Sequence, residues 1–198
     1  YSLQSKYEKS LIWVLRGLIA DPSDEGLIAN LAFAKAAVGD THLAEIAITR
    51  IKDASLVPYV KATEGLIALK RRDFAKAESL YREAEQTFEK LSRPDLAALA
   101  IAYYAKFALE SDAPDSARIR VEAESKFTKA RSIDGYLLMS RLSPSTPAPS
   151  IDDEPKRRLT QWVFDQESNT LTERPGVTAK GAPAIVVTAR KAPFPPRR

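Results

Sequence analysis

The sequence predicts an all-α region of antiparallel helical hairpins that is followed by a long irregular tail. Apolar residues recur with a helical period almost everywhere in residues 1–140. Helix breakers interrupt this period at short intervals, in the neighbourhoods of Pro22, Gly39, Pro58, Pro94 and Pro114. Beyond Arg141 the period is lost, and nine of the 13 prolines lie there. The chain therefore consists of two regions of different character.

Seven helices are expected, and start and stop signals mark their ends. Asp21-Pro22 ends the first apolar run, and Asp24 is a typical N-cap for the second. Gly39-Asp40 separates the second run from the third. The expected helices are residues 3–20, 25–38, 41–52, 58–70, 73–91, 96–110 and 115–132. Short turns between them favour antiparallel neighbours, so we expect roughly three-quarters or more of residues 1–140 to be helical, without a sheet.

Two of the expected hairpins align with each other along the chain. Placing Ala44 over Ala77 also places Gly39-Asp40 over Arg72-Asp73. The second copy has small residues and aromatic residues at matched spacing: Gly65, Ala77, Ala84, Phe74 and Tyr81. We expect Gly65 and Ala77 to be buried where two helices cross closely.

The segment EGLIALKRRDFAKAESLYREAEQ, which carries this pattern, resembles the tetratricopeptide repeat (TPR) family. The resemblance implies a short TPR-like α-solenoid over residues 1–140, with one clear copy, one partial copy and two degenerate flanking hairpins. The alternative is a non-repeat, alanine-rich helical bundle with the same core pattern.

The resemblance also implies a concave wall that is formed by the first helix of each hairpin and binds a partner segment. The side chains expected on this wall are Asn30, Phe33, Ala37, Tyr59, Thr63, Leu66, Lys70, Tyr103 and Lys106. Family members that clamp a carboxylate use Lys and Asn at set places, and Ala29, Phe33, Ala62 and Leu66 occupy those places here. Carboxylate clamping is therefore not expected.

No pattern typical of catalysis is found in residues 1–140. His42 is the only histidine and cysteine is absent, so the common metal sites lack ligands, and we expect no metal and no cofactor. The glycines are scattered, and no phosphate-binding loop is found. Three carboxylates, Glu78, Glu83 and Glu85, alternate with cations and favour an exposed, salt-bridged helix face. We expect a protein that is not an enzyme.

The tail divides into two parts by composition. Residues 141–158 form a Pro-rich linker, and residues 159–198 form a basic, Pro-containing segment that is either disordered or docked. The whole excess charge of +4 lies in residues 141–198. Leu159, Trp162 and Phe164 are too apolar for a spacer, so we expect them to dock on the chain's own helices or on a partner.

These features favour a protein–protein interaction scaffold, an adaptor or assembly factor with a protein partner. The alternative is a helical protein that binds nucleic acid through its basic tail. No apolar run reaches the about 18 residues of a membrane span. The lack of cysteine fits a reducing or an oxidising compartment. A cytoplasmic location is favoured, and a periplasmic one stays open because Tyr1 is consistent with removal of an upstream segment.

Overall fold

The computed structural model describes residues 7–130 together with residues 134 and 138. Of these residues, 82% are helical and none is in a strand, as the sequence predicts. The elements in chain order are α1 (Tyr7–Ala20), α2 (Glu25–Ala37), α3 (Thr41–Ile48), a 3₁₀ turn η1 (Ala54–Leu56), α4 (Val57–Lys70), α5 (Phe74–Lys90), α6 (Pro94–Glu110) and α7 (Ser116–Ala130).

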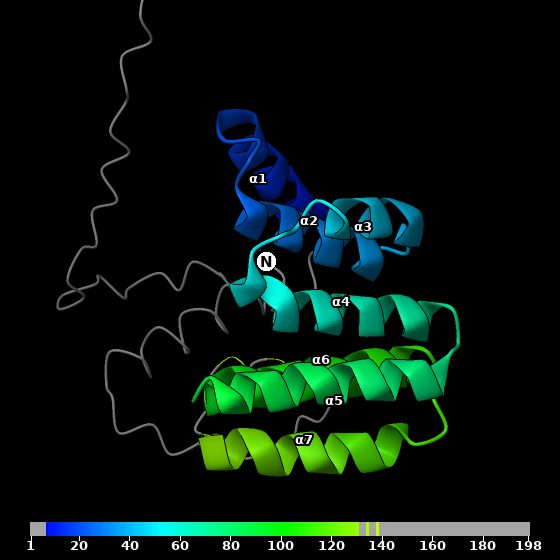
Figure 1. The fold of residues 1–198 in the computed structure, drawn as a ribbon. Coiled ribbons are helices and arrows are strands. Elements are labelled where there is room, and N and C mark those ends of the chain that lie inside the picture. Colours follow the sequence, from blue (N-terminus) through cyan, green and yellow to red (C-terminus); the bar gives the residue numbers. More distant parts are fainter. Residues whose placement is uncertain (1–6, 131–133, 135–137, 139–198) are drawn as a thin grey trace, which may run out of the picture.

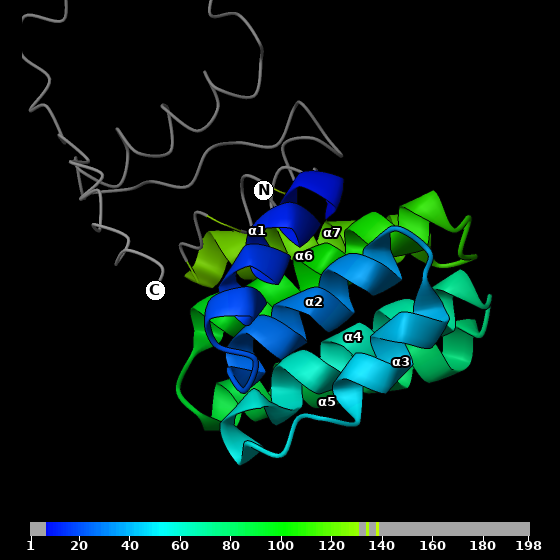
Figure 2. The same ribbon diagram turned by 90° about the horizontal axis from the view of Figure 1, so that it is seen from above.

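The helices form three consecutive hairpins, α2–α3, α4–α5 and α6–α7, with α1 preceding them (Figure 1). In each hairpin the two helices pack against each other, and α5 also packs against α6. The first helices of the hairpins are in direct contact, α2 with α4 and α4 with α6, so they form one continuous row (Figure 2). The fold of the described residues is therefore a helical repeat-like all-α array, and the row α2–α4–α6 is one wall of it.

One type of turn connects most of these helices. Gly39, Arg72, Ser92 and Asp112 each follow a helix with a positive φ. The next residue then donates its N–H to a carbonyl five positions earlier, as from Asp40 to Lys35 and from Asp73 to Ala68, both at 2.9 Å. The side chains of Asp40 and Asp73 cap the following helices by accepting the N–H groups of Leu43 and Lys76. The turns that align in the sequence thus have the same geometry.

The third helix is shorter than the sequence predicts. It was expected to reach residue 52, but α3 ends at Ile48. Two contacts account for this difference. The Thr49 hydroxyl donates to the Ile46 carbonyl, and the Glu25 carboxylate accepts the N–H groups of Lys52 and Asp53, each at 2.6 Å. Because Glu25 binds these two amides, they are not available for helical hydrogen bonds.

The expected close crossing of α4 and α5 is confirmed. Gly65 is buried and Ala77 is fully buried. A Cβ atom on Gly65 would lie 2.8 Å from Cδ2 of Tyr81 and 3.4 Å from the carbonyl oxygen of Ala77. Tyr81 is itself fully buried and stacks on Tyr104, with ring centroids 4.8 Å apart. The glycine therefore lets the two helices approach until only a ring fits between them.

The expected exposed salt-bridged face of α5 is wrong for one residue. Glu85 is only 5% exposed and forms ion pairs with Arg82 and Lys126. Arg82 also donates to both oxygens of Glu122, at 2.5 and 2.6 Å. These ion pairs join α5 to α7. The burial of Glu85 could not be predicted from the sequence pattern, because the spacing of charges along one helix does not show which helix packs against it.

Candidate functional site

A cavity of about 210 Å³ opens on the row α2–α4–α6. All three helices contribute to it, together with the end of α5. The lining residues are Ala29, Asn30, Phe33, Tyr59, Ala62, Thr63, Phe88, Leu96, Leu99, Ala100 and Tyr103. None of these side chains carries a charge at neutral pH. We call this feature the inner cavity.

Two pairs of aromatic rings line the inner cavity. Phe33 and Tyr103 meet edge to face with centroids 5.0 Å apart, and Tyr59 and Phe88 do the same at 5.0 Å. Thr63 also lines the cavity, is buried, and donates its hydroxyl to the Tyr59 carbonyl at 2.9 Å. Each ring has a neighbour that restricts its rotation, so the walls are preorganised.

The exposed polar groups of the inner cavity come from α2 and α4. Asn30 is exposed on α2, and Tyr59 is 42% exposed near the start of α4. An amide offers two donors and an acceptor. The cavity can therefore take an apolar group and offer hydrogen bonds beside it.

Five of the nine expected wall residues line the inner cavity: Asn30, Phe33, Tyr59, Thr63 and Tyr103. The other four, Ala37, Leu66, Lys70 and Lys106, do not. Ala37, Leu66 and Lys106 are buried, and Lys70 is partly buried.

The start of α1 packs against the part of the row that lies outside the inner cavity, near Phe107. Tyr7 is 7% exposed, and its ring lies 6.0 Å from those of Phe33 and Phe107. The ammonium group of Lys106 lies over Phe107 at 4.2 Å and over Tyr7 at 5.3 Å, and it pairs with Glu110. The row is therefore open at one end and covered by α1 near Phe107.

Six lining residues are not among the nine expected wall residues: Ala29, Ala62, Phe88, Leu96, Leu99 and Ala100. Leu96, Leu99 and Tyr103 follow the i, i+3, i+7 spacing of one helix face, so the same face could have been traced one and two turns back from Tyr103. Phe88 gives no such signal, because it belongs to the second helix of its hairpin and reaches the inner side only through its pairing with Tyr59.

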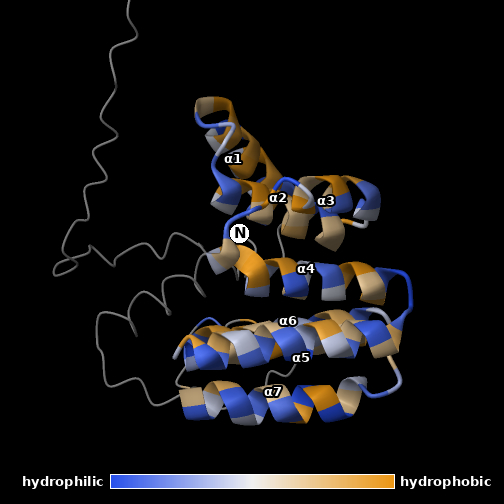
Figure 3. Ribbon diagram, in the orientation of Figure 1, coloured by the Kyte–Doolittle hydropathy of each residue, from blue (hydrophilic) through white to orange (hydrophobic). Residues whose placement is uncertain are grey.

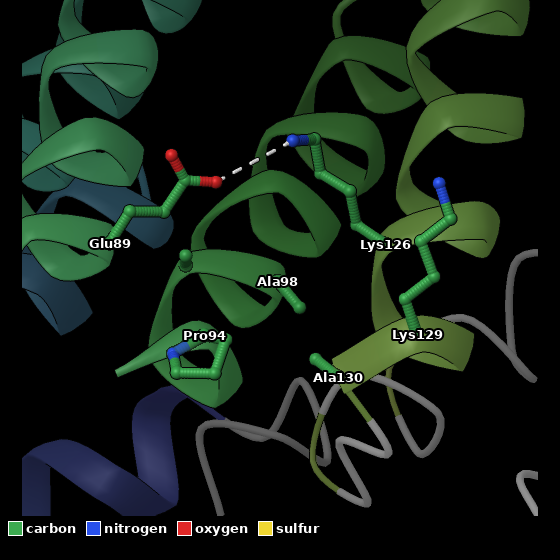
Figure 4. A pocket seen from close by; sticks show the side chains of 7 residues that line it. Glu89, Pro94, Ala98, Lys126, Lys129 and Ala130 are labelled. Atoms are coloured by element: carbon green, nitrogen blue, oxygen red, sulfur yellow. Dashed lines mark ion pairs between the residues drawn. The ribbon is translucent and has the colours of Figure 1, made fainter. Parts of the chain in front are cut away.

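A second cavity, of about 360 Å³, lies among α5, α6 and α7 (Figure 4). It is lined by Glu89, Pro94, Ala97, Ala98, Lys126, Lys129 and Ala130. Lys126 is already paired with the carboxylates of Glu85, Glu89 and Glu122. Its charge is thus balanced inside the protein, which weakens this cavity as an anion site.

The residues considered for chemistry are not brought together. His42 is exposed in the first turn of α3. In residues 7–130, 134 and 138, no group of three or more histidine, cysteine or acidic side chains could hold a metal ion. No helix in that part of the chain combines the length and apolar character of a membrane span.

The tail predictions lie outside the described residues. They concern the linker of residues 141–158, the segment of residues 159–198, and the anchors Leu159, Trp162 and Phe164. Comparison of the chain with family models, with curated proteins and with solved structures gives no match.

Proposed function

We propose that this protein is a non-catalytic scaffold of the tetratricopeptide type, an adaptor or assembly factor that binds a segment of a partner protein in the inner cavity. The observation that carries the proposal is the convergence of five residues, selected from the sequence as wall positions, on one open cavity. The tail segment of residues 159–164 acts in this proposal as a docking peptide.

The size and chemistry of the inner cavity support a peptide as the ligand. A volume of about 210 Å³ lies below the about 300–1,000 Å³ of pockets that enclose drug-sized molecules. It suits one or two apolar side chains of a longer segment that continues over the surface. The aromatic pairs supply apolar contact area, and Asn30 supplies hydrogen bonds to a peptide backbone.

Binding of nucleic acid is the second candidate, and its support is the basic tail. Ten Lys and Arg side chains against six acidic ones in residues 141–198 provide phosphate contacts. None of the described residues that line the inner cavity is cationic, so this cavity favours a peptide. The two candidates therefore use different parts of the chain.

Peptide selection followed by calorimetry tests the proposal. Peptides are selected from a random library on the full chain, and the tightest is titrated against variants. Tyr59→Ala and Asn30→Lys should each weaken binding by about tenfold or more, which is about 1.4 kcal/mol. The matched control is Val121→Ala, because Val121 is exposed on α7 and lies outside the inner cavity. Equal affinity of all variants, or no selected peptide, contradicts the proposal.

A salt titration separates the two candidates. Counterion release makes the affinity for a single-stranded oligonucleotide fall steeply between about 50 and 200 mM salt. Peptide binding in an uncharged cavity should change little over the same range. Tight oligonucleotide binding that depends strongly on salt, without peptide binding, favours the second candidate.

A further inference from the structure

Much of the helix α1 consists of hydrophobic residues (Figure 3), and several of their side chains are exposed. Ile12, Trp13, Leu15 and Ile19 are 52%, 55%, 47% and 82% exposed. Ile12, Leu15 and Ile19 follow one side of the helix, and Trp13 adjoins them. We call these four side chains the α1 face. Terminal elements of a stacked helical array normally present a polar outer face, so an apolar one indicates an unfilled contact.

Charge around the α1 face changes sign along the helix. Within α1, Lys9 and Arg16 outnumber the single carboxylate of Glu8. The guanidinium of Arg16 lies 4.9 Å from the centre of the Trp13 ring. Just beyond the helix, residues 21–25 carry three carboxylates, including those of Asp21 and Asp24. The face therefore has cations along its length and an acidic cluster at its C-terminal end.

One segment of this chain has the complementary order of charges and apolar groups. Residues 156–158 are Lys-Arg-Arg, residues 159–164 are mostly apolar, and Asp165 and Glu167 follow. In an extended chain, alternate side chains point to the same side, so Trp162 and Phe164 can contact one surface together. The spacing between them is then about 6.6 Å, which fits within the about 10 Å from Ile12 to Ile19.

We propose that residues 159–164 dock on the α1 face, antiparallel to α1. In this orientation residues 156–158 lie near Asp21 and Asp24, and the acidic residues after Phe164 lie near Lys9 and Arg16. The proposal names the surface on which the docking peptide of the proposed function binds, and it rests on that role of the peptide.

Chain length and contact area both favour this occupant. The 20 residues of 139–158 span up to about 66 Å when extended, more than the about 36 Å diameter expected for a compact body of this size. Residue Leu138, which precedes them, belongs to the same buried cluster as Tyr7 of α1. A tether of this length gives an effective concentration on the order of millimolar.

A second copy of the chain fits the α1 face less well. One side of α1 measures about 21 by 10 Å, whereas each partner in a stable complex buries roughly 800 Å². A tethered segment does not need so large an interface, because the tether already holds it near the surface of the same chain. The tail of the same chain is therefore the occupant that the available surface favours.

Disulfide trapping tests this proposal directly, because the full chain contains no cysteine. The test variant carries Ile19→Cys and Thr160→Cys, which replace one residue of the α1 face and one non-anchoring residue of the segment. The matched control carries Val121→Cys and Thr160→Cys, with Val121 60% exposed on α7. Under mild oxidation in dilute solution, the test pair should form an intramolecular disulfide about tenfold faster than the control pair.

Three further variants fix the cause and the direction of docking. Adding Trp162→Ala to the test pair should remove its advantage, whereas Val187→Ala, an apolar change elsewhere in the tail, should leave it intact. Ile12→Cys with Thr160→Cys should cross-link more slowly than the test pair if the segment is antiparallel.

The remaining outcomes overturn the proposal. Disulfide-linked dimers in place of intramolecular bonds assign the α1 face to a second copy of the chain. Equal rates for the test and control pairs mean that the segment does not dock there. Neither outcome touches the inner cavity, so the peptide titrations decide the proposed function separately.

Discussion

The close crossing of α4 and α5 predicts that Gly65→Ala destabilises the protein. A Cβ atom at this position would lie 2.8 and 2.9 Å from two carbons of the Tyr81 ring. The shorter distance falls 0.6 Å below the 3.4 Å at which ordinary contact begins. Tyr81 is fully buried between this crossing and the stacked ring of Tyr104, so it has no free space into which to move.

The magnitude follows from two opposing effects. Overpacking a core by one methyl group costs about 1–3 kcal/mol. Replacing glycine by alanine within a helix returns about 1 kcal/mol. Gly17→Ala in α1 is the matched control, because its Cβ would meet only the end of the flexible Leu27 side chain, which can rotate away. The difference between the two variants cancels the helix-propensity effect and should be about 1–3 kcal/mol.

Urea denaturation followed by circular dichroism measures this difference. Gly65→Ala should unfold at lower urea than the wild type or at about the same concentration, and Gly17→Ala at the same concentration or higher. A Gly65→Ala protein as stable as the Gly17→Ala protein contradicts the reasoning, since it would mean that α4 and α5 do not approach so closely. Ala77→Leu, at the same crossing, should then also be tolerated.

Three further perturbations test the ion pairs and the helix caps by the same denaturation assay. Arg82→Gln should cost about 1–3 kcal/mol because a buried carboxylate loses a partner, whereas Arg71→Gln, at an exposed pair, should cost at most about 1 kcal/mol. The hydrogen bond from Arg82 lowers the pKa of Glu122 below its usual 4.5, so this pair stabilises the fold above pH 4.5 and is lost as the pH falls through the folded-state value. Glu122→Gln should therefore make the loss of stability in acid shallower, and an unchanged profile contradicts this assignment. Asp73→Ala removes the cap of α5 and should cost about 1 kcal/mol; no loss would mean that the cap does not contribute.

Much of the fold could be predicted from local signals in the sequence. Asp24, Asp40 and Asp73 are N-cap residues in the structure, and the helices begin directly after them. The small residues Gly65 and Ala77 are buried at a crossing because their size sets the distance between two helices. Caps and small residues act over short distances, so the sequence order alone reveals them.

Contacts between distant segments could not be predicted in this way. In the sequence, Tyr7 is one apolar residue of an amphipathic helix. In the structure, its ring contacts Phe107 and covers part of the row α2–α4–α6. Glu85 reads as a surface carboxylate, yet α7 brings Lys126 to it and buries it. In both cases the outcome depends on how a second helix is placed, which the spacing within one helix does not contain.

The central claim is that a peptide segment binds in the inner cavity, and chemical-shift mapping tests it most directly. The backbone resonances of the full chain are compared before and after addition of the selected peptide. The largest changes should cluster at Asn30, Phe33, Tyr59 and Tyr103, which come from three different helices and all line this cavity. Changes confined to the basic tail or to the outer side of α7 around Val121 contradict it.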